Sequence, residues 1–136
     1  MIDRAIFVST DLFEVTTVGE HFINPRCFGE DFARFLRERL VNEGVTSSDP
    51  IQEDFGWVLL LGEAPQRLTL SVGVLDDSIG RVPAVWRVDL AFEKAQNGLG
   101  AWFRRAPEPE LDSTFGLVHS LLSTDPRLRV ANEEPA

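Results

Sequence analysis

Two segments of the chain alternate apolar residues with mostly polar ones, and this period of two strongly limits the fold. Such alternation predicts β-strands with one buried face and one wetter face. The turns at 62–66 and 76–80 are short, which favours an antiparallel meander. The apolar positions are Leu68, Leu70, Val72 and Val74 in the first segment, and Trp86, Val88, Leu90 and Phe92 in the second.

The preceding segment, residues 55–61, is predicted to be a strand with apolar residues on both faces. Phe55 and Trp57 are expected on one face, and Val58 and Leu60 on the other. We therefore expect a central strand, or a strand whose second face is covered. If Val58 and Leu60 lie on an open face, sheet-to-sheet pairing in a homodimer would bury them.

A helix is predicted to follow residue 28 and to stop at Gly44. Glu30 and Asp31 suit its first turn, because acidic side chains favour the positive end of the helix dipole. Gly44 suits the position just after the helix. Apolar residues at helical spacing form one stripe, which consists of Phe28, Phe32, Phe35, Leu36 and Leu40.

A second helix is predicted to begin near Asp112, which has a side chain suited to an N-cap. Asp125 and Pro126 are expected to end it, because proline cannot continue a helix. Its apolar face is expected to carry Phe115, Val118, Leu121 and Leu122.

Two helices and a meander predict an α+β fold. We expect a two-layer sandwich, in which a mostly antiparallel sheet of four to five strands carries both helices on one face. Residues 5–18 suit one interrupted strand or two, and residues 128–130 suit a short edge strand. Residues 1–131 are expected to form one domain, followed by a frayed acidic tail at 132–136.

The net charge of −9 restricts the class of partner. Nucleic acids and anionic membranes would be repelled, so neither is expected to bind. No apolar run approaches the roughly 20 residues that span a bilayer, and the N-terminus does not resemble a signal peptide. One cysteine, Cys27, excludes an internal disulfide and suits a reducing compartment. We therefore expect a cytoplasmic protein.

The cysteine and the histidines indicate no metal site or cofactor, because His21 and His119 belong to no metal-binding pattern. Cys27 follows Arg26 and precedes a helix, a setting that would lower a thiol pKa. A nucleophilic pair of Cys27 with either histidine is one interpretation. The favoured interpretation is a small buried side chain, and no catalytic residue is predicted.

Two adjacent carboxylates, Glu53 and Asp54, stand at the expected start of the strand that contains Trp57. Neighbouring strand residues point to opposite faces, so this pair is poorly arranged to share one site. If the preceding loop brings Arg26 close, Arg26, Glu53, Asp54 and Trp57 would form a small-molecule or hydrolytic site. Solvated strand ends are the simpler interpretation.

Trp102 and Phe103 lie in a glycine-rich connection that Arg104 follows. Aromatic residues and arginine are enriched at binding hot spots, so this step suits an interface anchor. The alternative is that Trp102 seals one end of the sheet.

The order of two short patterns resembles that of small, uncharacterised bacterial α+β proteins. These patterns are a G-E-D helix start within residues 28–36 and an E-D-x-G-W strand start within residues 52–57. The resemblance covers roughly the first half of the chain and implies no established activity. Some proteins of similar size and acidity are immunity factors against toxins. That analogy rests on size and charge and on no shared sequence motif.

The leading hypothesis is therefore a non-enzymatic cytoplasmic domain that binds a protein partner. The more specific version of this hypothesis is that the partner is a basic protein. The rival hypothesis is a small-molecule or hydrolytic site near Glu53 and Asp54.

Overall fold

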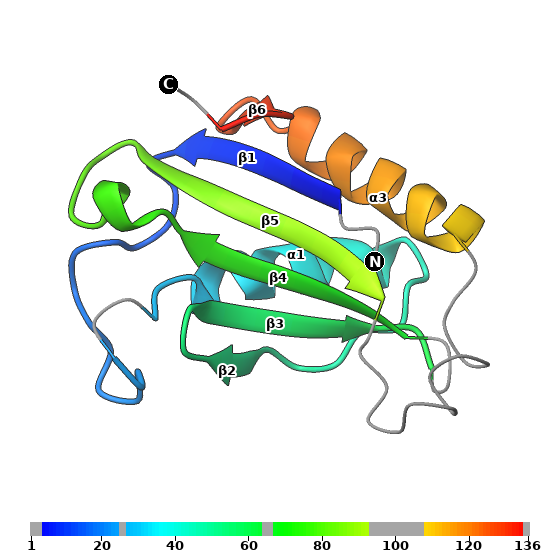
Figure 1. Cartoon of the computed structure of the whole chain (residues 1–136), viewed down its shortest axis with the longest axis horizontal. Helices are drawn as coiled ribbons and strands as arrows, with labels where there is room; N and C mark the ends of the chain where they lie inside the picture. Colours follow the sequence, from blue (N-terminus) through cyan, green and yellow to red (C-terminus); the bar gives the residue numbers. More distant parts are fainter. Residues whose placement is uncertain (1–3, 25–26, 64–66, 93–107, 135–136) are drawn as a thin grey trace.

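The structure is a computed structural model, and it describes residues 4–24, 27–63, 67–92 and 108–134. The described chain has the predicted α+β class, with helices packed against an antiparallel sheet (Figure 1). Its elements are β1 (Arg4–Thr10), α1 (Glu30–Asn42), β2 (Ile51–Glu53), β3 (Gly56–Leu61), β4 (Leu68–Val74), the 3-10 turn η1 (Asp76–Ser78), β5 (Ala84–Phe92), α3 (Glu108–Ser123) and β6 (Arg129–Ala131).

The sheet has six strands in the order β2-β3-β4-β5-β1-β6, and each strand is antiparallel to its neighbours. Strands β3 to β5 form the predicted meander, and β2 adds an antiparallel strand beside β3. Strand β1 then lies between β5 and the short strand β6, so the first and last strands of the described chain are neighbours at one edge of the sheet (Figure 1). The sequence predicted four to five strands. The count differs because β2 is a separate short strand, joined to β3 by a tight hairpin turn.

The predicted alternation is confirmed, because alternate residues of the central strands point to one core. Apolar residues of α1 and α3 enter the same core, so both helices lie on one face of the sheet. On the other face, called here the outer face, no helix or strand of the described residues packs. The core residues of the strands are Ile6, Val8, Trp57, Leu59, Leu61, Leu68, Leu70, Val72, Val74, Ala84, Trp86, Val88 and Leu90.

The predicted first helix is confirmed as α1, and local chemistry sets its end. The backbone N–H of Gly44 donates to the carbonyl of Val41, and that of Val45 donates to Leu40. These two bonds form a Schellman motif, which needs a residue with positive φ after the helix. Gly44 supplies it with φ +86°.

The predicted start of the second helix is wrong. Helix α3 begins at Glu108, so Asp112 lies inside the helix and is not its N-cap. Pro109 falls in the first turn, where a helix needs no backbone N–H from it. The Asp112 carboxylate instead accepts a hydrogen bond from Arg4 at 2.8 Å, which ties the helix to strand β1.

Neither of the two alternatives for residues 5–18 is right, because one strand, β1, is followed by an irregular segment and residues 12–18 form no strand. Phe13 and Val15 of that segment are buried in the core. The Phe13 ring stacks on Phe32 of α1, with 4.2 Å between ring centroids. These residues are apolar because they cover one end of the core, and not because they form a strand.

Candidate functional site

A tight hairpin turn shapes the segment that carries the adjacent carboxylates. Glu53 pairs with Gly56 at the end of the β2–β3 ladder, so Asp54 and Phe55 form a two-residue loop. The prediction that Phe55 shares the inward face with Trp57 is wrong. Phe55 lies in the loop and is 52% exposed, whereas Trp57 is 4% exposed.

The loop packs closely against strand β4. A Cβ atom on Gly73 of β4 would lie 3.0 Å from the carbonyl oxygen of Phe55 and 3.8 Å from its ring atom Cδ2. A side chain at this position would therefore push the loop and the Phe55 ring away. The small residue on β4 allows Phe55 to rest beside the outer face of the sheet.

Buried hydrogen bonds hold the hairpin to the segment that precedes α1. The Trp57 indole Nε1 donates to the carbonyl oxygen of Cys27 at 2.8 Å. The Cys27 thiol in turn donates to the carbonyl oxygen of Glu53 at 3.1 Å. Buried polar groups need hydrogen-bond partners, so these bonds hold the backbone of Glu53 in place beside Cys27.

Cys27 is a free, fully buried cysteine, and burial raises the pKa of its thiol. A raised pKa lowers the fraction of reactive thiolate. The two histidines contact other groups, since His21 lies 2.6 Å from Glu30 and His119 lies 3.3 Å from Ser123. The structure therefore gives the interpretation of Cys27 as a nucleophile no support.

A groove crosses the outer face of the sheet and encloses about 720 Å³. Strands β2 to β5 and the hairpin loop contribute its walls and floor. We call it the sheet groove, and Figure 1 shows the sheet from the side on which it lies, with α1 behind. It is lined by Ile51, Glu53, Phe55, Val58, Leu60, Thr69, Ser71, Arg87, Asp89, Ala91 and Phe92.

The charges of the sheet groove are unevenly paired. Arg87 donates to the carboxylate of Asp89 at 2.9 Å, so these two charges neutralise each other. Glu53 is exposed, and its carboxylate has no ion-pair partner among the described residues. Ile51 and Phe55, on either side of it in the sequence, are 39% and 52% exposed. One unpaired negative charge therefore stands between two exposed apolar side chains.

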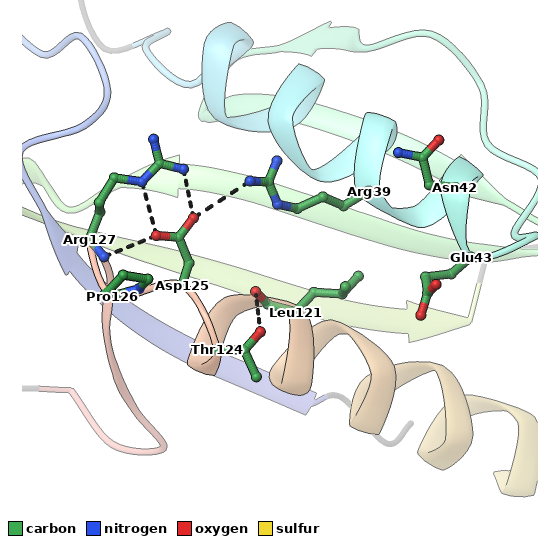
Figure 2. A pocket seen from close by; sticks show the side chains of 8 residues that line it. All are labelled: Arg39, Asn42, Glu43, Leu121, Thr124, Asp125, Pro126 and Arg127. Atoms are coloured by element: carbon green, nitrogen blue, oxygen red, sulfur yellow. Dashed lines mark hydrogen bonds and ion pairs between the residues drawn. The ribbon is translucent and has the colours of Figure 1, made fainter.

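A second hollow, of about 480 Å³, lies where the C-terminal ends of α1 and α3 meet (Figure 2). We call it the helix-end cleft. Its floor is built around Asp125, whose side chain is 8% exposed. The cleft is lined by Arg39, Asn42, Glu43, Leu121, Thr124, Asp125, Pro126 and Arg127.

Two arginines converge on Asp125 in this cleft, as Figure 2 shows. Arg127 donates to both carboxylate oxygens, at 2.9 and 2.7 Å, and Arg39 lies 3.6 Å from one of them. Hydrogen bonds from the Arg127 side chain and backbone lower the pKa of Asp125 to about 2. The arginines are balanced by Asp125 and Glu43, so the cluster ties α1 to the turn after α3 and leaves little net charge for a ligand.

The structure separates the residues that the sequence proposed for a site. Arg26, Trp102 and Arg104 lie outside the described residues, so their roles stay predictions. Glu53 lines the sheet groove, whereas Asp54 stands in the loop and does not line it. The two carboxylates are both exposed, and they do not meet at one site.

Part of the sheet groove could have been read from the sequence. The alternation of β4 and β5 puts Ser71, Arg87 and Asp89 on the wetter face, opposite the core. The contribution of Ile51 and Phe55 was missed, because the segment was interpreted as one strand and not as a hairpin. The signal was Asp54 followed two residues later by Gly56, since aspartate and glycine are both frequent in turns.

Comparison with known proteins gave no match among family models, curated proteins or solved structures. Within the described residues, no group of three or more histidine, cysteine, aspartate or glutamate side chains is arranged to hold a metal ion. Neither α1 nor α3 is both long enough and apolar enough to cross a membrane, as far as the described chain extends.

Proposed function

We propose that this chain is a cytoplasmic, non-enzymatic domain that binds a basic protein through the sheet groove. One observation carries the proposal: Ile51 and Phe55 leave 39% and 52% of their surface exposed at the edge of a partly apolar groove. Large apolar side chains gathered at an exposed surface are typical of contact sites between proteins.

Charge supports a basic partner. The chain carries a net charge of −9, which attracts cationic proteins at long range and speeds their association. Within the groove, Glu53 offers a carboxylate that no described side chain pairs. The single cysteine, buried and free, is consistent with the reducing cytoplasm.

A small-molecule or hydrolytic site near Glu53 and Asp54 is the weaker alternative. Acid–base catalysis by two carboxylates needs both side chains at one reacting centre. Glu53 faces the groove and Asp54 stands in the exposed hairpin loop. We therefore prefer a protein partner.

Site-specific photo-crosslinking in the native cell tests the proposal. A benzophenone amino acid replaces Phe55 in one variant and Val41 in the control. Val41 is also an exposed apolar residue, but it lies on α1, away from the sheet groove. We expect the variant at position 55, and not the control, to capture a basic protein that mass spectrometry can identify.

The captured protein is then purified, and its binding is measured by calorimetry. We expect Phe55→Ala to weaken the complex at least about tenfold, as for an interface anchor. Equal capture at positions 41 and 55, or binding that Phe55→Ala leaves intact, would refute the proposed function.

A further inference from the structure

We infer that the sheet groove recognises a segment in which a lysine or arginine stands beside apolar residues, with the cation at Glu53 and the apolar side chains against Leu60 and Ile51. The inference rests on the proposed function and specifies its partner.

The floor of the groove provides the apolar part of this recognition. Val58 and Leu60 lie on the outer face of β3, and Val58 is paired with Ile51 across the β2–β3 ladder. Val58 and Phe7 of β1 are buried, yet neither belongs to the core between sheet and helices. These two side chains therefore offer little surface to a partner. The apolar surface within the groove comes from Leu60, which is partly exposed, and from Ile51, which is 39% exposed.

The cation site follows from which charges are already paired. Two carboxylates and one guanidinium line the groove, and Arg87 is held by Asp89 at 2.9 Å. The remaining negative charge is that of Glu53, which lines the groove together with the exposed ring of Phe55. A cation placed here gains an ion pair and an aromatic face.

The same charges argue against two other occupants. A second copy of the chain would bring another net charge of −9 and another unpaired Glu53 to the same face. A nucleic acid or an anionic lipid surface would present phosphates to that carboxylate. A basic protein segment is the occupant whose charge complements the groove.

Selection from a phage-displayed library of random peptides tests the inference on the full chain. We expect the enriched peptides to contain lysine or arginine next to apolar residues. Their affinity, measured by fluorescence anisotropy at about 0.15 M salt, should fall at least about tenfold with Glu53→Gln. The control Glu38→Gln removes an exposed carboxylate from α1, and it should leave the affinity unchanged.

A charge exchange makes the result specific to position 53. The variant Glu53→Lys should reject the selected peptides and should bind versions in which the cation is replaced by glutamate. Glu53 is exposed, so these variants should keep the fold, which circular dichroism checks.

The outcomes separate the two levels of the hypothesis. If Phe55→Ala abolishes peptide binding but Glu53→Gln does not, the cation site is wrong and the groove still binds proteins. If the enriched peptides bind Phe55→Ala and Glu53→Gln as tightly as they bind the parent protein, the inference fails. The sheet groove would then not be the binding surface of the proposed function. Light scattering that shows a dimer dispersed by Phe55→Ala would identify a second copy as the occupant and overturn the inference.

Discussion

A Cβ atom on Gly56 would lie 2.2 Å from the backbone carbonyl oxygen of Val72, so the hairpin and strand β4 meet backbone to backbone. Gly56 also has φ +156°, which side-chain-bearing residues rarely adopt. This contact sets the path of the chain just after the loop that carries Phe55. The shape of the sheet groove therefore depends on a residue without a side chain.

Replacing Gly56 by alanine should lower the free energy of unfolding by about 3 kcal/mol or more, because backbone strain and a backbone clash add together. Gly44→Ala is the control. Gly44 also has positive φ, +86°, but an added Cβ would meet no atom within 4 Å. That variant should cost about 1 kcal/mol, from strain alone. Urea denaturation measures both, and equal costs would show that the contact with Val72 is unimportant.

Trp57 and Trp86, which are both buried, should respond differently to replacement by phenylalanine. Trp57→Phe removes the 2.8 Å bond to the Cys27 carbonyl. Trp86 is fully buried, and its Nε1 has no hydrogen-bond partner among the described residues, so Trp86→Phe removes no such bond. We expect the first variant to be less stable than the second by about 1 to 2 kcal/mol. Thermal unfolding of both variants checks this, and the reverse order would contradict it.

Cys27 should react slowly with thiol reagents in the native protein. Its thiol is fully buried, and burial raises its pKa, so both access and thiolate fraction are reduced. In urea the same thiol should react at the rate of a free cysteine. Because the thiol bonds to the carbonyls of Glu53 and Gly56, Gly56→Ala should speed native labelling. Fast labelling of the unmodified protein would show that the hairpin opens readily.

The ion pairs around Asp125 should make stability depend on pH in acid. The pKa of this carboxyl is lowered from 3.8 to about 2 in the folded chain. Its contribution is therefore fully present above about pH 4 and is lost as the pH falls toward 2. We expect about 1 to 2 kcal/mol, allowing for solvent around the half-exposed Arg127.

Urea midpoints of the parent and of Asp125→Asn, measured from pH 6 down to pH 3, test this pH dependence. The difference between them should shrink as the pH falls. Asp49→Asn is the control, because Asp49 is 85% exposed at 3.6 Å from Arg37. Its effect should be small at every pH. A difference for Asp125→Asn that stays constant with pH would contradict the assignment.

Phe55 should contribute little to stability, although it is aromatic. Its side chain is 52% exposed, whereas that of Phe28 is 1% exposed. Phe28→Ala should cost about 3 to 5 kcal/mol, and Phe55→Ala less than about 1 kcal/mol. Calorimetric unfolding of the two variants measures the contrast. A large loss with Phe55→Ala would mean that this residue serves the fold rather than a partner.

The sequence alone predicted the elements whose residues repeat with a regular period. The alternation in β4 and β5 and the apolar stripe of α1 are confirmed, because burial on one face imposes those periods directly on the residues. The position of Gly44 after α1 followed in the same way, from a backbone angle that glycine adopts readily.

Features that depend on contacts between residues distant in sequence could not be predicted from a periodic pattern. Helix α3 begins before Asp112, and Phe13 fills the core from an irregular segment. The clearest case is Phe55, which alternation assigned to the core. It lies instead in the two-residue loop between Glu53 and Gly56, where it is 52% exposed.

The sequence by itself therefore determined the α+β class, the inward residues of the regular strands and the acidity of the chain. The tertiary structure decided which apolar residues stay exposed and which carboxylate faces a groove. The physical reason is that a repeating pattern records burial on one face of an element, whereas a turn takes its direction from the neighbouring strand against which it packs.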